Sequence, residues 1–86
     1  MIKLQWTLSF KKDYQDLAEN IKEQAKKQFR LLSENPRHPS LRVKKMAGTV
    51  NIWEARITKG YRLTFQIEGE VFLLRRIGGH DILKKP

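Results

Sequence analysis

The strongest constraint on the fold is a stretch of alternating side chains between Asn51 and His80, interrupted by two short glycine turns. The alternating runs span 52–57, 61–67 and 71–77, and the turns lie at 58–60 and 68–70. Apolar and polar side chains that alternate with a period of two, bounded by turn residues, indicate β-strands joined as hairpins. We therefore predict three consecutive strands that form an antiparallel meander.

The alternation also predicts which side chains share a face of this sheet, because residues two apart in a strand point the same way. The residues predicted to face the core are Tyr61, Leu63, Phe65 and Ile67 in one strand and Trp53, Ala55 and Ile57 in its neighbour. On the opposite face, Glu54 and Arg56 then join Arg62. One carboxylate and two guanidinium groups are thus predicted to share a surface.

Before the meander, the pattern predicts one strand and two helices. Alternation over residues 2–8 predicts the strand, Ser9 is well placed as a helix N-cap, and apolar residues then recur at helical spacing. Asn20 followed by Glu23 resembles a capping box. We expect helices at about 10–18 and 21–34, with a single long helix as the alternative.

Two prolines, Pro36 and Pro39, end the helical pattern, and His38 between them is expected to be a solvated loop residue. Residues 41–46 predict a further, strongly basic strand, whereas 81–86 are too few to assign. The element order is β-α-α-β-β-β-β in one domain, 1–86. Such an order predicts an α+β fold in which two N-terminal helices pack on one face of a curved antiparallel sheet and leave the other face open.

Composition limits the possible functions. The chain has no cysteine, only two histidines far apart, and no glycine-rich loop of nucleotide-binding spacing, so we predict no metal and no cofactor. No apolar run has the length of a signal-peptide core or a membrane span, which favours a cytoplasmic protein without a membrane partner. Eighteen Lys and Arg against nine Asp and Glu give a net charge of +9. Such an excess favours a nucleic acid or an acidic protein as partner, and the alternative is a soluble surface that is simply rich in lysine.

The shared surface contains the groups that metal-free RNA cleavage requires: a base, an acid and cations that stabilise the phosphate. Glu54 is the candidate base, and Arg56 and Arg62 can grip a phosphate. His80 is the candidate acid, because histidine changes charge near neutral pH and this one follows a double glycine where a strand ends. The alternative is an ordinary cross-strand ion pair followed by a strand-ending turn.

Four segments, in this order, resemble the RelE/ParE superfamily of bacterial and archaeal toxins. The segments are 35–45 (NPRHPSLRVKK), 52–57 (IWEARI), 60–65 (GYRLTF) and 77–81 (IGGHD). The resemblance implies a small α+β toxin that is neutralised by a cognate antitoxin with an acidic, partly disordered tail. RelE-like members cut mRNA on the 70S ribosome without a metal, whereas ParE-like members inhibit DNA gyrase. A member that has lost activity and acts only as a nucleic-acid-binding co-repressor is the third alternative.

The resemblance also implies roles for single residues. Arg62 matches a phosphate-binding arginine, and Glu54 and Arg56 lie on the strand where members carry catalytic residues. His80 matches a position where a histidine or arginine serves as acid or transition-state cation. These residues together favour the nuclease branch, although residues 82–86 lack the aromatic side chain that several of its members place near the C terminus.

Three further basic residues, Lys44, Lys45 and Arg76, are expected to add RNA affinity as part of a basic surface that meets ribosomal RNA. Arg75 and Arg76 are adjacent in a predicted strand. Since neighbouring residues of a strand point to opposite faces, only one of these two is expected to face the site.

Overall fold

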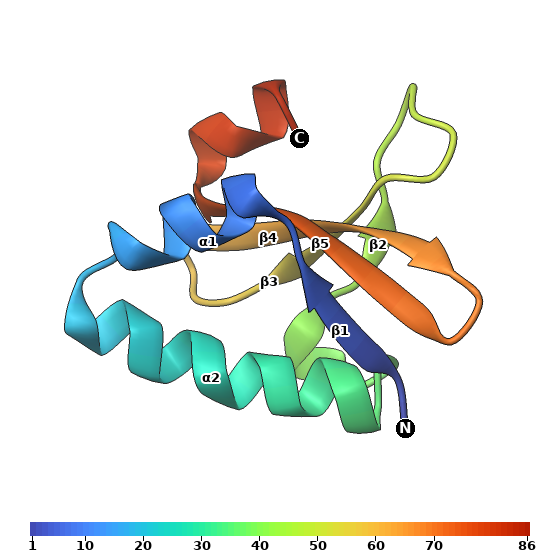
Figure 1. Cartoon of the computed structure of the whole chain (residues 1–86), viewed down its shortest axis with the longest axis horizontal. Coiled ribbons are helices and arrows are strands. Elements are labelled where there is room, and N and C mark those ends of the chain that lie inside the picture. The colour runs from blue at the N-terminus through green and yellow to red at the C-terminus, as the bar shows by residue number, and fades with distance from the viewer.

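The computed structural model describes residues 1–86 and confirms the predicted order of helices and strands (Figure 1). The elements are β1 Lys3–Trp6, α1 Leu8–Gln15, α2 Glu19–Glu34, β2 Lys44–Lys45, β3 Trp53–Arg56, β4 Tyr61–Glu68 and β5 Val71–Gly79, with 3-10 turns η1 at Pro39–Leu41 and η2 at His80–Lys84. The two helices are separate, so the alternative of one long helix is wrong. None of the helices is both long and apolar enough to cross a membrane.

The strands form one sheet in the order β1-β5-β4-β3-β2. The meander β3–β4–β5 is antiparallel as predicted, and β2 pairs antiparallel with β3. The pairing of β1 differs from the expectation, because this strand runs parallel to β5. Parallel neighbours need a long connection, and here almost the whole chain lies between the two strands. The sheet is therefore mixed, and β4 is its central strand, between β5 and β3.

The core lies between the sheet and the two helices. Ala55, Leu63 and Phe65 are buried on the face predicted from the alternation, and Phe10 of α1 and Leu32 of α2 pack against that face. Tyr61, Ile67 and Trp53 are only partly buried at its border. An aromatic cluster of Trp6, Phe10, Tyr14 and Phe29 joins β1 to both helices.

Both helix starts differ from the sequence prediction. The N-cap of α1 is Thr7, not Ser9: its hydroxyl oxygen accepts a hydrogen bond from the Phe10 N–H at 3.2 Å and donates to the Leu74 carbonyl at 2.9 Å. The cap is thus held by β5, a contact that the local sequence does not contain. The second helix begins at Glu19 after Ala18, without a side-chain cap, so the capping box expected at Asn20 does not form.

The strand predicted at 41–46 is also largely wrong. Leu41 ends the η1 turn, and Arg42 takes the left-handed backbone conformation with φ 46° and ψ 47°. A strand cannot continue through such a residue, because it bends the chain out of the extended region. Only Lys44 and Lys45 pair with β3.

The outer face of the sheet, opposite α2, is not left open as predicted. Residues 80–86 fold over part of it, and Figure 1 shows this C-terminal segment on the side away from α2. Thr64 is fully buried there and donates a hydrogen bond to the Pro86 main-chain oxygen at 3.0 Å. Ile82 is 5% exposed and packs against Gly78. The uncovered part of this face is therefore confined to the β2–β3–β4 side.

Candidate active site

The strand register brings three of the predicted site residues together on the outer face. Glu54 lies opposite Thr64, and Arg56 lies opposite Arg62. The Glu54 Oε1 atom is 3.9 Å from the Arg62 Nε atom. Glu54 is only 9% exposed, so the carboxylate is held at the bottom of this face beside the guanidinium. The contact is an ion pair between adjacent strands, as the alternation predicts.

Arg62 has surroundings that disfavour its charge. Burial lowers the pKa of its guanidinium, the positive charge of Arg56 adds to this effect, and the negative charge of Glu54 opposes it. All hydrogen bonds of the guanidinium use Nη1, which donates to the carbonyl oxygens of Thr58, Lys59 and Tyr61 at 2.7–3.1 Å. The β3–β4 turn therefore fixes the side chain and leaves Nη2 for a ligand oxygen.

A third cation, Arg42, belongs to the same cluster and was missed from the sequence. Its charge is close enough to contribute to the lowered pKa of Arg62. Arg42 lies between η1 and β2, where its left-handed backbone conformation turns the chain, and its side chain is exposed. Non-glycine residues in this conformation are concentrated at functional sites. No local sequence signal marks the position, because arginine is not a residue that favours this backbone conformation.

His80 lies apart from these residues in the hydrogen-bond network. It is the first residue of η2 and is exposed, and it forms no hydrogen bond or ion pair with Glu54, Arg56 or Arg62. The register places Gly78 opposite Arg62, so His80 comes two residues after the position on β5 that faces Arg62. Two residues of extended chain correspond to about 7 Å. The imidazole is thus attached close to the Arg62 end of the site, at the margin of the sheet.

The two lysines predicted to bind RNA are both exposed on β2 but face different sides. Lys44 pairs with Glu54, so it shares the outer face with the site. Lys45 pairs with Trp53, whose side chain is on the core face. Only Lys44 is therefore on the same surface as the carboxylate.

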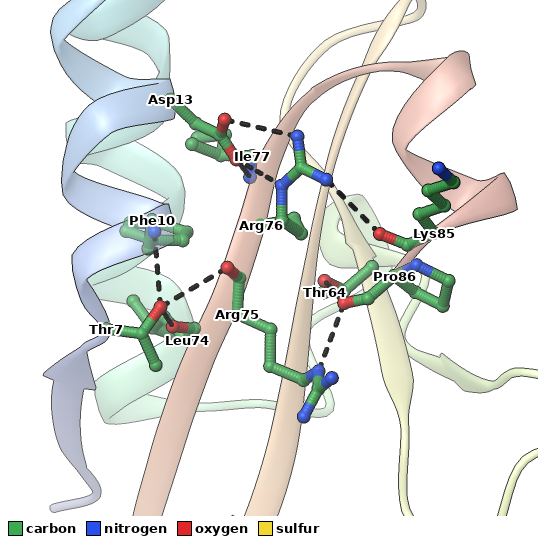
Figure 2. A network of polar contacts seen from close by, with 10 residues as sticks. All are labelled: Thr7, Phe10, Asp13, Thr64, Leu74, Arg75, Arg76, Ile77, Lys85 and Pro86. Carbon is green, nitrogen blue, oxygen red and sulfur yellow. Dashed lines mark hydrogen bonds and ion pairs between the residues drawn. The ribbon is translucent and has the colours of Figure 1, made fainter.

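Arg75 and Arg76 both reach the outer face, so the expectation that only one could do so is wrong. The cause is a β-bulge: Thr64 pairs with Arg76 and Phe65 with Leu74, which leaves Arg75 as an extra residue. Figure 2 shows both guanidiniums next to the C-terminal segment. Arg75 donates from Nε to the Pro86 oxygen at 3.0 Å, and from Nη1 to Gln66.

Arg76 is held by Asp13 of α1 in a two-pronged ion pair. Its Nε and Nη2 atoms lie 2.6 and 3.2 Å from the two carboxylate oxygens, and Nη1 donates to the Lys85 carbonyl at 3.3 Å (Figure 2). The hydrogen bond to Asp13 raises the pKa of Arg76. Asp13 also accepts a hydrogen bond from the Ile77 N–H at 3.2 Å, in the part of β5 that does not pair with β1. Arg76 therefore has a structural role in joining α1 to the sheet.

The arrangement supplies a carboxylate and three guanidiniums around one patch of sheet, together with an imidazole at its margin. A carboxylate can accept a proton, and guanidiniums bind phosphate oxygens in pairs. No group of three or more His, Cys, Asp or Glu side chains gathers in a way that could hold a metal ion.

This geometry can be compared with known proteins. The family model described as "ParE toxin of type II toxin-antitoxin system, parDE" matches residues 4–83. The chain belongs to this toxin family. It is thereby a member of the RelE/ParE superfamily, as its sequence motifs indicate. No curated protein matches the sequence.

Solved structures of toxins share the fold of this family member. A YoeB/ParE toxin from Agrobacterium tumefaciens superposes with a TM-score of 0.77 at 24% identity, over 92% of this chain and 99% of the other. A chain of the intact E. coli RelBE toxin-antitoxin complex superposes with a TM-score of 0.74 at 23% identity, over 92% of this chain and 96% of the other. A RelB-RelE complex from Methanococcus jannaschii gives 0.75 at 20% identity, over 94% and 95%. These likenesses establish the α+β fold of two helices on a five-stranded mixed sheet.

Proposed function

We propose that this toxin is a metal-independent endoribonuclease that cuts mRNA on the ribosome and so inhibits translation. The observation that carries the proposal is the ion pair of Glu54 with Arg62 on the outer face, with Arg56 beside it. A nearly buried carboxylate next to several guanidiniums is costly to maintain for stability alone, and such clusters are concentrated at functional sites. The resemblance of the motifs to RelE-like members supports the same activity.

In the proposed reaction, Glu54 accepts the proton of a ribose 2′-hydroxyl through Oε2, the oxygen that is not paired with Arg62. The 2′ oxygen attacks the adjacent phosphorus, and the bond from phosphorus to the 5′ oxygen breaks. His80 donates a proton to this leaving oxygen. The products are a 2′,3′-cyclic phosphate and a free 5′-hydroxyl, so the reaction needs no water and no metal.

Arg62 and Arg56 stabilise the negative charge that gathers on the phosphate during this attack. The Nη2 atom of Arg62 is available for it, because the hydrogen bonds of that guanidinium use Nη1. Lys44 shares the face and adds affinity for RNA, with Lys45 next to it at the sheet edge. The cognate partner in this proposal is an acidic antitoxin that neutralises the +9 chain, and the ribosomal target places the activity in the cytoplasm.

Expression of the toxin alone is expected to arrest growth, and Arg62→Ala or His80→Ala is expected to relieve the arrest. Lys84→Ala is the matched control, because Lys84 is also exposed in η2 and lies outside the site. Removing a catalytic acid or a charge-stabilising group lowers the rate by roughly 100-fold or more. The direct measurement is cleavage of mRNA on programmed ribosomes in vitro. Undiminished cleavage by both site variants would refute the assignment.

Inhibition of DNA gyrase is the second candidate, and the match to the ParE toxin family is the observation that favours it. A supercoiling assay separates the two: a gyrase inhibitor blocks supercoiling and leaves ribosome-bound mRNA intact. A chain that does neither but binds DNA or RNA with strong salt dependence corresponds to the inactive co-repressor. A neighbouring gene for a small acidic protein supports either toxin over the co-repressor.

A further inference from the structure

A polar pocket of about 210 Å³ lies at the opposite end of the outer face from Glu54, between the start of α1 and the C-terminal segment. Its lining residues are Thr7, Ser9, Arg75, Arg76, Lys85 and Pro86. None of the six is a hydrophobic residue that would suit an apolar ligand, and three of them carry a positive charge. Figure 2 shows how Thr7, Arg75 and Pro86 surround this region.

The charge around the pocket is unbalanced. Arg75, Arg76 and Lys85 contribute three positive charges. The Asp13 carboxylate is bound to Arg76, the Asp81 charge also acts on Arg76, and Arg75 Nε donates to the oxygen of Pro86, the last residue of the structure. Asp13 does not line the pocket. No acidic side chain is therefore present among the lining residues to repel an anion.

Several hydrogen-bond donors of these residues have no partner in the chain. Arg75 uses Nε and Nη1, which leaves Nη2, and the Lys85 ammonium forms no ion pair. The Ser9 hydroxyl is unused as well, and the Ser9 N–H is in the first turn of α1, where helices have no internal acceptor. The free donors of Arg75 and Ser9 match the acceptor oxygens of a tetrahedral anion, and Lys85, whose ammonium points away from Arg75 and Pro86 in Figure 2, adds its charge at the rim.

We propose that this pocket binds a phosphate group of an RNA backbone, at a second site distinct from the Glu54–Arg62 pair. The row of residues Glu54, Thr64 and Arg76 crosses three adjacent strands. Two strand spacings put the two sites roughly 10 Å apart. The binding does not depend on cleavage, so this site stands even if the toxin proves not to be a nuclease.

The first test measures binding of a short 2′-O-methyl RNA oligonucleotide, which has no free 2′-hydroxyl and cannot be cut. Lys85→Gln is compared with Lys84→Gln, because the two exposed neighbours lose the same charge and only Lys85 lines the pocket. Fluorescence anisotropy is expected to show three- to tenfold weaker binding for Lys85→Gln, roughly what one lost phosphate contact removes. For Lys85→Gln, the slope of the logarithm of the binding constant against the logarithm of the salt concentration should be shallower by about 0.7, the value for one phosphate contact with a single strand.

Equal losses for Lys84→Gln and Lys85→Gln overturn the site, because they indicate attraction by net charge alone. A second pair of variants makes the same comparison by adding charge. Ser9→Asp puts a carboxylate into the pocket at a helix start, where it stabilises the helix, so weaker RNA binding cannot come from unfolding. Gln24→Glu changes the net charge equally at an exposed position of α2. Only Ser9→Asp is expected to weaken RNA binding by threefold or more.

Inorganic phosphate provides the last comparison. Added to the isotopically labelled full chain, it is expected to shift the NMR signals of the Ser9 N–H and the Arg75 Nε–H, and the oligonucleotide is expected to compete for them. Shifts with phosphate but no competition by RNA overturn the RNA assignment and leave a site for free phosphate. No shift with phosphate at these two residues overturns the site itself.

Discussion

Arg62 and Arg76 lie on the same face of the sheet, but their surroundings act on them in opposite directions. Burial and Arg56 lower the pKa of Arg62, whereas the hydrogen bond to Asp13 raises that of Arg76. A raised pKa of a base means that its charge stabilises the fold, and this contribution is present at neutral pH and lost only in strong alkali. A lowered pKa means that the charge opposes folding. The charge of Arg76 therefore contributes to the stability of the fold, whereas the charge of Arg62 lowers it.

Asp13 provides the residue-scale prediction. Asp13→Ala removes the partner of Arg76 and leaves the Ile77 N–H without an acceptor, which is expected to lower the free energy of unfolding by about 2–3 kcal/mol. Asp13→Asn keeps an oxygen for that N–H and loses only the charge, so about half of this loss is expected. Urea denaturation measures both. Equal stabilities of the two variants would show that the charge and the N–H contact are not separable in this way.

At this scale, the sequence predicts residues whose position follows from regular alternation. Glu54, Arg56 and Arg62 share a face because Glu54 and Arg56 are two residues apart and Arg56 pairs with Arg62, whereas the buried residues Ala55 and Leu63 next to them point the other way. Arg42 and Arg75 could not be predicted in this way. The first depends on a left-handed backbone conformation, and the second on an extra residue in β5. Both interrupt the period on which sequence-based assignment of faces depends.

At the scale of elements, the meander is predictable because its strands are joined by short turns that bring neighbours together. The partner strand of β1 is not predictable from the sequence, because the pairing of β1 with β5 joins segments from opposite ends of the chain. The η2 turn also escapes prediction. It has five residues and no helical period of its own, and its position comes from Ile82 packing against the sheet rather than from local preference.

Gly78 and Ile82 provide the element-scale prediction. A Cβ atom at Gly78 would lie 2.9 Å from the Ile82 Cγ2 atom, which is too close, so Gly78→Ala is expected to destabilise the chain by about 1–3 kcal/mol. Ile82→Ala removes the clashing atom and is expected to cost about 2–4 kcal/mol alone, because the residue is buried. In the double variant the added methyl fills part of the space left by Ile82.

The double variant should therefore be more stable than the sum of the single losses predicts, by at least about 1 kcal/mol. Urea denaturation of all four proteins measures this coupling. Strict additivity would mean that η2 is not seated against β5 at Gly78. In that case the cover over Thr64, and the pocket beside Lys85, would not be permanent features of the surface.

Across the whole molecule, the two faces of the sheet have different compositions and therefore different roles. The core face carries the apolar residues that hold the helices, and the outer face carries the carboxylate and the arginines. A net charge of +9 on 86 residues also repels itself in the folded state. Part of the stability gained by burial on one face is thus offset by repulsion among the charges, including those on the other face.

Because the net positive charge opposes folding, we predict that added salt stabilises the folded chain by screening this repulsion. Between about 50 and 500 mM NaCl, Tm is expected to rise by several degrees, since the screening length falls from roughly 14 to 4 Å. The variant Lys27→Gln with Arg30→Gln loses two exposed charges from α2, neither of which forms an ion pair. It should have a higher Tm at low salt and a smaller salt effect, measured by thermal unfolding followed by circular dichroism. A Tm that falls with salt in both proteins would mean that attractive ion pairs, such as those of Arg62 and Arg76, outweigh the net repulsion.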